Sequence, residues 1–287
     1  MTNNTFTIIT PSFNQDQFIE KTINSVLSQE GGFYIDYIVA DGGSTDNSVE
    51  IIKKYDKLLK NKKYPVKCKG INYRWWSEKD NGQSHAINKG LTLASGDVLA
   101  WINSDDFYEQ GAFRYINNMF KSYKQIDLFY GDCYQVTDKK LEKKLIKLKQ
   151  IDYKKIIKWG CLIYQPAAFF TKRIINKIGL LNEELKYCMD YDLWLRILKE
   201  NNCLYCPRVL ANYRLWPDSK TVSQIKKLHQ ESEKVRRKYG GRIFEQPNIS
   251  RIRSLIPFSA LVKNKYPKIY KFLKIKLYKI INLLINR

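Results

Sequence analysis

The sequence predicts an α/β protein: a Rossmann-like, mostly parallel sheet flanked by helices, with a basic helical appendage at the C-terminus. Three observations support this prediction. Strand-like and helix-like segments alternate through residues 6–102, polar clusters follow several of the strands, and residues 248–287 contain ten Lys or Arg and no Asp or Glu. We therefore expect one large domain at 1–219 and a basic helical region at 220–287.

The expected strands of the front half are short runs of β-branched and aromatic residues that end in turns. The first run ends at Pro11, and the second ends at an Asp-Gly-Gly turn followed by Ser44, Thr45 and Asp46, which are typical helix N-cap residues. Segments with apolar residues at helical spacing lie between the strands, which is typical of right-handed βαβ units. In chain order we expect a strand at 6–10, a helix at 19–27, a strand at 34–40, a helix at 47–59, a strand at 73–76, a helix at 84–93 and a strand at 97–102.

The second half of the chain is less regular. Residues 128–136 and 144–148 have the pattern of strands, and residues 152–158 and 172–178 that of short helices. A longer helix is expected at 190–200, and the pattern from about residue 220 onward is helical and basic. The sequence contains no internal repeat and no low-complexity linker.

Polar clusters follow four of the front segments, at residues 10–14, 41–46, 80–83 and 103–106. Each cluster taken alone is typical of a turn that caps the next helix. In a parallel sheet, however, the carboxyl ends of the strands lie at one edge, and ligands bind beyond that edge. The convergence of four clusters there predicts a binding site.

A divalent cation is the expected partner of phosphate groups at this site. No GxGxxG or Walker A sequence is present, so a glycine-rich loop is not expected to bind phosphate. Asn103, Ser104, Asp105 and Asp106 instead supply oxygen ligands of the kind that Mg²⁺ or Mn²⁺ prefers. Asp41 and Asp80 each end a strand and open a turn, where they can accept hydrogen bonds from a base or ribose.

Seven short motifs occur in order along the chain: 8–14 (IITPSFN), 41–46 (DGGSTD), 80–90 (DNGQSHAINKG), 94–97 (ASGD), 101–106 (WINSDD), 165–169 (QPAAF) and 189–196 (MDYDLWLR). In sequence and in order they resemble motifs of the family 2 glycosyltransferases, which are inverting enzymes of the glycosyltransferase A fold. The resemblance covers roughly residues 6–221. It implies transfer of a sugar from a nucleotide-diphosphate sugar to a hydroxyl acceptor, of the kind that builds bacterial surface polysaccharides.

The resemblance also implies residue roles and makes 1–219 the catalytic domain. Asp105, with Asn103, stands where the family holds Mg²⁺ or Mn²⁺, and Asp190 stands where it has the catalytic base. The position of Asp190 agrees, because a carboxylate that opens a helix after a loop can face an acceptor hydroxyl. Asp192 is the alternative base, although its place beside Leu193 fits a structural role better. The residues expected to bind the donor nucleotide are Thr10, Pro11, Ser12, Asn14, Asp41, Asp80, Gln83 and Ser104.

Three positions depart from the family pattern. Asn103 replaces a carboxylate of the metal motif, Met189 stands where the family often has Glu, and Trp216 stands where it commonly has a His that helps to bind metal or phosphate. These departures weaken the expectation of strict metal dependence, and Arg214 or Lys220 are candidates to offset the charge of the leaving diphosphate. For His85, which lies in the 80–90 motif, donor contact and simple surface placement both remain open.

The net charge of +22 predicts a polyanionic partner. Residues 267–287 can form one helix with Leu and Ile on one face and Lys on the other, which fits either an anionic membrane surface or packing on the catalytic domain. A lipid-linked glycan acceptor would place the enzyme at the cytoplasmic face of the inner membrane. Neither a signal peptide nor a transmembrane helix is expected. The six cysteines are interpreted as reduced thiols, and a zinc site at the CxxC of residues 203–206 is not expected.

Two rival functions explain less of the sequence. A nucleic-acid-binding protein would account for the basic charge, but carboxylates at strand ends repel phosphate when no metal is present, so no nucleic acid partner is expected. A sugar nucleotidyltransferase has a similar architecture, but its glycine-rich basic loop has no counterpart in residues 10–17.

Overall fold

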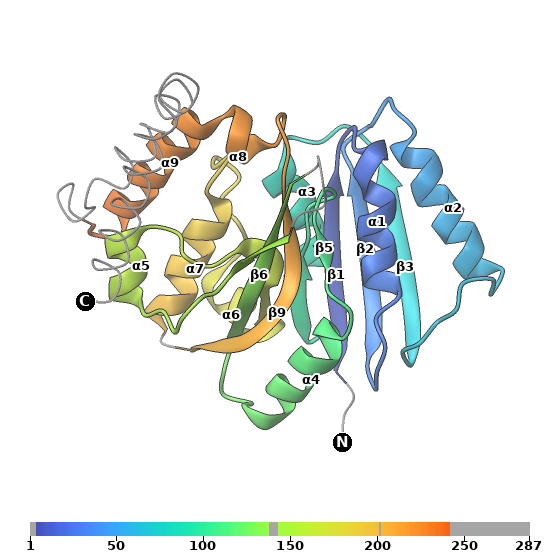
Figure 1. Ribbon diagram of the computed structural model, residues 1–287, viewed down its shortest axis with the longest axis horizontal. Coiled ribbons are helices and arrows are strands. Elements are labelled where there is room, and N and C mark those ends of the chain that lie inside the picture. Colours follow the sequence, from blue (N-terminus) through green and yellow to red (C-terminus); the bar gives the residue numbers. More distant parts are fainter. Residues whose placement is uncertain (1–3, 138–142, 201, 242–287) are drawn as a thin grey trace, which may run out of the picture. The chain divides into compact units, whose positions relative to one another are not determined.

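The computed structural model describes residues 4–137, 143–200 and 202–241. These residues form one nine-stranded sheet flanked by helices (Figure 1). The strands follow the order β3-β2-β1-β4-β8-β6-β9-β5, with β7 paired to β6. The predicted α/β class is confirmed.

The front half contains every element expected there, with bounds that differ by a few residues. Strand β1 pairs in parallel with β2 and with β4, and β2 pairs in parallel with β3. The carboxyl ends of these strands therefore lie at one edge of the sheet, which is the upper edge in Figure 1. The elements are β1 (Thr5–Ser12), α1 (Asp16–Leu27), β2 (Tyr34–Asp41), α2 (Ser48–Lys60), β3 (Gly70–Ser77), α3 (Gln83–Leu93) and β4 (Val98–Trp101).

The second half makes the sheet mixed. Strand β8 is antiparallel to both β4 and β6, β9 is parallel to β6, and β5 is antiparallel to β9. Four elements were not predicted: β5, α4, β8 and β9. The elements of this half are β5 (Phe107–Tyr108), α4 (Ala112–Ser122), β6 (Leu128–Thr137), β7 (Lys143–Ile146), α5 (Tyr153–Trp159), a 3₁₀ turn (Gln165–Ala167), β8 (Ala168–Thr171), α6 (Lys172–Ile178), α7 (Met189–Lys199), β9 (Cys203–Leu215), α8 (Lys220–Ser223) and α9 (Ile225–Lys238).

Two apolar cores lie on opposite faces of the sheet, because successive residues of a strand point to opposite sides. Ile8 belongs to the core that α1, α2 and α4 cover, and Ile9 to the core that α3, α5, α6, α7 and α9 cover. In the second core, Trp101 of β4 stacks on Trp194 of α7 with 5.7 Å between ring centroids. Burial on both faces explains why the central strands read as nearly continuous apolar runs.

Helices α8 and α9 belong to the same compact unit as the sheet, which extends to Gly241. Helix α9 contributes Val235 to the second core and contacts α7. The division into 1–219 and 220–287 stays a prediction, because 242–287, including the expected helix at 267–287, lies outside the described residues. Among the described helices, none combines the length and apolar character needed to cross a bilayer.

Candidate active site

The predicted polar clusters meet at the carboxyl edge of the parallel strands. Gly42 lies so close to Asp80 that a methyl group on Gly42 would come within 2.8 Å of Asp80 Oδ2. Gln83, at the start of α3, donates from Nε2 to Asn103 Oδ1 over 2.6 Å. The clusters at 41–46, 80–83 and 103–106 are thus neighbours in space.

Asp41 organises the turn that follows β2. Its carboxylate, in a side chain only 1% exposed, accepts hydrogen bonds from the backbone N–H groups of Gly43 and Ser44 at 3.1 and 2.9 Å. The hydroxyls of Ser44 and Ser77 also donate to it. Since four protein donors already engage this carboxylate, the observed contacts of Asp41 hold the turn in place.

The end of β1 contributes buried and exposed polar groups to the same edge. Thr10 is fully buried and its hydroxyl pairs with that of Tyr37, so it lies within the sheet. Ser12 is 5% exposed, and its hydroxyl has no hydrogen-bond partner among the described residues, as expected of a group that meets a ligand. Asn14 adopts a left-handed backbone conformation (φ 52°), and its side-chain oxygen accepts from Thr45 N at 2.9 Å. The 10–14 and 41–46 clusters are therefore joined directly.

A chain of side chains connects Lys220 of α8 to the predicted metal motif at 103–106. Lys220 Nζ donates to Gln83 Oε1 over 2.7 Å, Gln83 donates to Asn103, and Asn103 Nδ2 lies 3.5 Å from Asp106 Oδ2. Asp106 is 1% exposed and its Oδ1 accepts from the backbone N–H of Arg214 at 2.8 Å. Burial and the neighbouring Asp105 raise the pKa of Asp106 well above its usual range. Asp106 therefore ties the motif to β9.

Asp105 has an unusual partner. The indole Nε1 of Trp216 donates to Asp105 Oδ2 over 2.8 Å, and the Arg214 guanidinium Nε donates to the Asp105 backbone carbonyl over 2.8 Å. Burial raises the pKa of the Asp105 carboxyl, and the hydrogen bond from Trp216 opposes that rise. The rings of Trp216 and Phe18 pack in a T-shaped arrangement with 5.1 Å between their centroids, which restricts the indole. Trp216, which stands where the family commonly has a His, thus orients the carboxylate of the predicted metal ligand Asp105.

The residues at this edge suit a cation that a ligand's phosphates would help to hold. Across residues 4–137, 143–200 and 202–241, no group of three or more His, Cys, Asp or Glu side chains is arranged to hold a metal ion. Asp106 is committed to β9 and Asn103 to Gln83, so Asp105 is the carboxylate left for a cation. Mg²⁺ is commonly held by one or two carboxylates together with substrate phosphates, and Asp105 supplies one such carboxylate.

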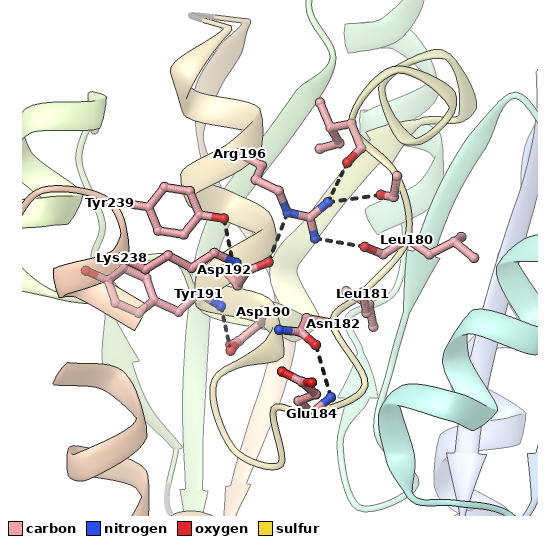
Figure 2. A network of polar contacts seen from close by, with 12 residues as sticks. Leu180, Leu181, Asn182, Glu184, Asp190, Tyr191, Asp192, Arg196, Lys238 and Tyr239 are labelled. Carbon is pink, nitrogen blue, oxygen red and sulfur yellow. Dashed lines mark hydrogen bonds and ion pairs between the residues drawn. The ribbon is translucent and has the colours of Figure 1, made fainter. Parts of the chain in front are cut away.

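Asp190 lies in the first turn of α7, directly after the loop at 179–188. Its Oδ1 accepts from the backbone N–H of Tyr191 at 2.8 Å (Figure 2). Burial raises the pKa of the Asp190 carboxyl to about 6, and the negative charge of Glu231 adds to the rise. A carboxylate with a pKa near 6 suits a general base, because it is ionised at neutral pH and still has appreciable affinity for a proton.

Asp192, two residues further along α7, is engaged by other side chains. It is 1% exposed and accepts from Arg196 Nε at 2.9 Å, from the Tyr239 hydroxyl at 2.8 Å and from Lys238 Nζ at 3.3 Å (Figure 2). Its carboxylate joins α7 to the end of α9, which supports the structural interpretation of this residue.

Sequence reasoning missed two parts of the site. It gave no role to Glu231, although Glu231 and Glu233 are the only acidic residues between Lys220 and Gly241. It also treated Trp216 as the loss of a ligand and did not foresee its hydrogen bond to Asp105. For His85 the structure shows a buried Nδ1 without a partner among the described residues, which leaves both interpretations open.

Comparison with known proteins gives the family. The profile described as "Glycosyl transferase family 2" matches residues 7–179. The chain is 27% identical over 271 residues to the Escherichia coli "UDP-Glc:alpha-D-GlcNAc-diphosphoundecaprenol beta-1,3-glucosyltransferase WfgD", covering 92% of this chain and 96% of WfgD. It is 26% identical over 198 residues to the Bacillus subtilis "Minor teichoic acid biosynthesis protein GgaA", covering 64% of this chain and 41% of GgaA.

Solved structures show the same fold. Staphylococcus aureus TarS 1–349, solved with UDP-GlcNAc, matches with a TM-score of 0.60 at 15% identity, covering 80% of this chain and 65% of that one. The mannosyltransferase PcManGT from Pyrobaculum calidifontis, solved with GDP-Man and Mn²⁺, matches with a TM-score of 0.58 at 12% identity, covering 95% and 83%. The fold is therefore that of the glycosyltransferase A enzymes. The profile match spans more than half of the chain, and the protein belongs to glycosyl transferase family 2.

Proposed function

We propose that this glycosyltransferase inverts the anomeric configuration of the sugar it transfers, and that Asp190 is its catalytic base. The observation that supports the proposal best is the Asp190 carboxyl, whose pKa is raised to about 6 at the start of α7. Asp192 is a weaker candidate, because three side-chain donors from Arg196, Lys238 and Tyr239 occupy its carboxylate.

In the proposed reaction the acceptor oxygen attacks the anomeric carbon of the donor sugar in one displacement. Asp190 takes the proton of the acceptor hydroxyl while the bond between the anomeric carbon and the diphosphate oxygen breaks. The nucleoside diphosphate leaves with its negative charge, and the cationic groups of Lys220 and Arg214 offset part of that charge. The orphaned hydroxyl of Ser12 supports its role in donor binding, together with Asn14, Asp80, Gln83 and Ser104 at the same edge.

We infer that Mg²⁺ or Mn²⁺ is the cofactor, with Asp105 as its carboxylate ligand and Asn103 beside it. A cation held there would supply Lewis-acid stabilisation of the leaving diphosphate. The Mn²⁺ reported with the structurally similar PcManGT supports this assignment.

The name of WfgD supports a lipid-linked acceptor, because it describes transfer from UDP-Glc to a diphosphoundecaprenol-linked sugar. We propose a polyprenyl-diphosphate glycan as acceptor and a UDP-sugar as donor. Such an acceptor would place the enzyme at the cytoplasmic face of the inner membrane, in contact with an anionic lipid surface.

A donor screen tests the proposal. UDP-, GDP- and dTDP-sugars are incubated with the protein, Mn²⁺ and a polyprenyl-diphosphate-linked GlcNAc, and release of nucleoside diphosphate is followed. The configuration of the new linkage is then read by NMR. We expect one nucleotide class to react and the linkage to be inverted. Retention of configuration would refute the role of Asp190 as the base of a single displacement.

A further inference from the structure

The loop at 179–188 connects α6 to α7 and lies between the predicted donor site and the predicted base. On the donor side it packs against α3: the side chain of Asn88 donates to the Leu181 carbonyl and accepts from the Leu181 N–H, both at 2.9 Å. Ser84 donates to the Leu185 carbonyl over 3.0 Å, and Lys186 Nζ donates to the Asn81 carbonyl over 3.2 Å. On the other side the loop leads directly into the first turn of α7.

Two side chains anchor the ends of this loop. At its start, the Arg196 guanidinium donates to the carbonyls of Ile178, Gly179 and Leu180 at 2.8 to 3.1 Å (Figure 2). At its end, Glu231 of α9 accepts from three successive backbone N–H groups. These are the N–H groups of Lys186, at 2.9 Å to Oε1, and of Tyr187 and Cys188, at 2.6 and 2.7 Å to Oε2.

The hydrogen bonds that Glu231 accepts are charge-assisted. Hydrogen bonds to an ionised acceptor are roughly twice as strong as neutral ones, and here both carboxylate oxygens are used. The carboxylate also sits just before the first turn of α7, where the helix dipole favours a negative charge. Backbone N–H groups that one carboxylate holds cannot rotate independently, so the direction in which α7 begins is fixed two residues before Asp190.

We propose that Glu231 is a positioning residue for the catalytic base: by holding residues 186–188 it aims Asp190 at the acceptor. The inference rests on the proposed role of Asp190 and adds a residue from α9 to those that support catalysis. Glu231 itself contacts neither substrate nor Asp190 in this assignment. It acts through the backbone of residues 186–188 and through its negative charge, which adds to the rise of the Asp190 pKa that burial causes.

Removal of Glu231 leaves other contacts that keep α9 in place. Val235 is buried in the second core, Arg236 is fully buried, and Tyr239 remains hydrogen-bonded to Asp192. A Glu231→Gln variant is therefore expected to fold. Its amide has one acceptor oxygen in place of two, and it places an NH₂ donor where the backbone also donates, so part of the clamp is lost.

The test compares kcat, donor KM and the pH profile of Glu231→Gln with those of the full-length wild-type protein. We expect kcat to fall by about 10²-fold, the scale for a small misplacement of a catalytic group. The KM for the donor should stay unchanged, because donor contacts are not removed. The acid limb of kcat should also move to lower pH, since the charge of Glu231 raises the pKa of Asp190. Burial and the charge of Asp190 raise the pKa of the Cys161 and Cys188 thiols, so these two neighbours stay neutral and add no charge of their own.

Glu233→Gln is the matched control. Glu233 lies on the same helix, two residues away, and pairs with Arg236 and Arg237 without contacting the loop. Its substitution also removes one carboxylate from α9, and we expect it to lower Tm while kcat and the acid limb stay at wild-type values.

Two outcomes would overturn the inference. One is a Glu231→Gln variant with the kcat and acid limb of Glu233→Gln. If Glu231→Gln does not fold, Glu231→Asp takes its place, because the shorter side chain cannot reach all three N–H groups. A folded Glu231→Asp variant with wild-type kcat would then overturn the inference. The Asp190→Asn variant distinguishes failure of the proposed function from failure of this inference. If Asp190→Asn keeps wild-type kcat, Asp190 is not the base. If Asp190→Asn is inactive while Glu231→Gln keeps wild-type kcat, only the positioning role of Glu231 is refuted.

Discussion

Replacing Asp190 by asparagine removes the proposed proton acceptor and keeps the size and shape of the side chain. The amide oxygen can still accept the hydrogen bond from Tyr191 N, which the carboxylate accepts at 2.8 Å, so the first turn of α7 should be preserved. We expect transfer to fall by roughly 10²- to 10⁴-fold, the usual contribution of a general base. Affinity for the donor nucleotide should not change, because Asp190 is not among the expected donor residues.

The pH dependence of turnover gives a second quantitative test of the role of Asp190. With a pKa of about 6, Asp190 is ionised in about 90% of molecules at pH 7 and in about 10% at pH 5. A base must be ionised to act, so wild-type turnover should fall roughly tenfold from pH 7 to pH 5. The residual activity of Asp190→Asn should be flat across this range, because the titrating carboxyl is gone.

Asp192→Asn is the control for this experiment. Asp192 is engaged by Arg196, Lys238 and Tyr239, so its substitution should lower Tm but keep the acid limb near pH 6. The assay is single-turnover transfer at saturating donor and acceptor, between pH 5 and pH 8, with Tm measured for each variant. Near-normal turnover in Asp190→Asn together with inactive but folded Asp192→Asn would refute the assignment and move the base by two residues.

Three further predictions concern the cation and the basic C-terminus. Asp105→Ala should abolish the Mn²⁺-dependent part of donor-nucleotide binding by isothermal titration without unfolding the protein, and an unchanged affinity would remove Asp105 from the metal site. Trp216→His should tighten binding of Mn²⁺, measured by EPR without nucleotide. Trp216 Nε1 lies 2.8 Å from Asp105 Oδ2, so an imidazole at this position would add a protein ligand beside Asp105. Equal Mn²⁺ binding in both proteins would contradict this. Removal of 267–287 should release the protein from anionic vesicles but spare transfer to a soluble acceptor, since each of its lysines is worth about 1 kcal/mol at an anionic surface. Full-length protein that ignores anionic vesicles in co-sedimentation at low salt would refute the membrane role.

The front of the fold could be predicted because its signals are local. Strand β1 and helix α1 show their character in their own residues, and the turn at Asp41 carries typical capping residues. Strands β8 and β9 could not be predicted in the same way. Strand β8 has only four residues after a 3₁₀ turn, and β9 contains Pro207 and several polar residues, so pairing with β6 decides its conformation.

The same difference between local and long-range signals applies to the residues of the candidate site. Asp105 and Asp190 stand in motifs that are visible in the sequence. The hydrogen bond from Trp216 to Asp105 joins residues 111 positions apart, and no local pattern reports it. The contacts of Glu231 are still harder to foresee, because its partners are backbone N–H groups, which every residue except proline carries.

The docking of α9 determines where the protein can be shortened. A fragment that stops at residue 219 would retain every family motif up to 189–196, yet it would lose Lys238 and Tyr239, two of the partners of Asp192, and Glu231, the partner of the 186–188 backbone. It would also uncover the apolar residues that Val235 covers, and a newly exposed apolar patch promotes aggregation. The shortest fragment that should fold independently therefore ends at Gly241, where Tyr239 and the last turn of α9 are still present.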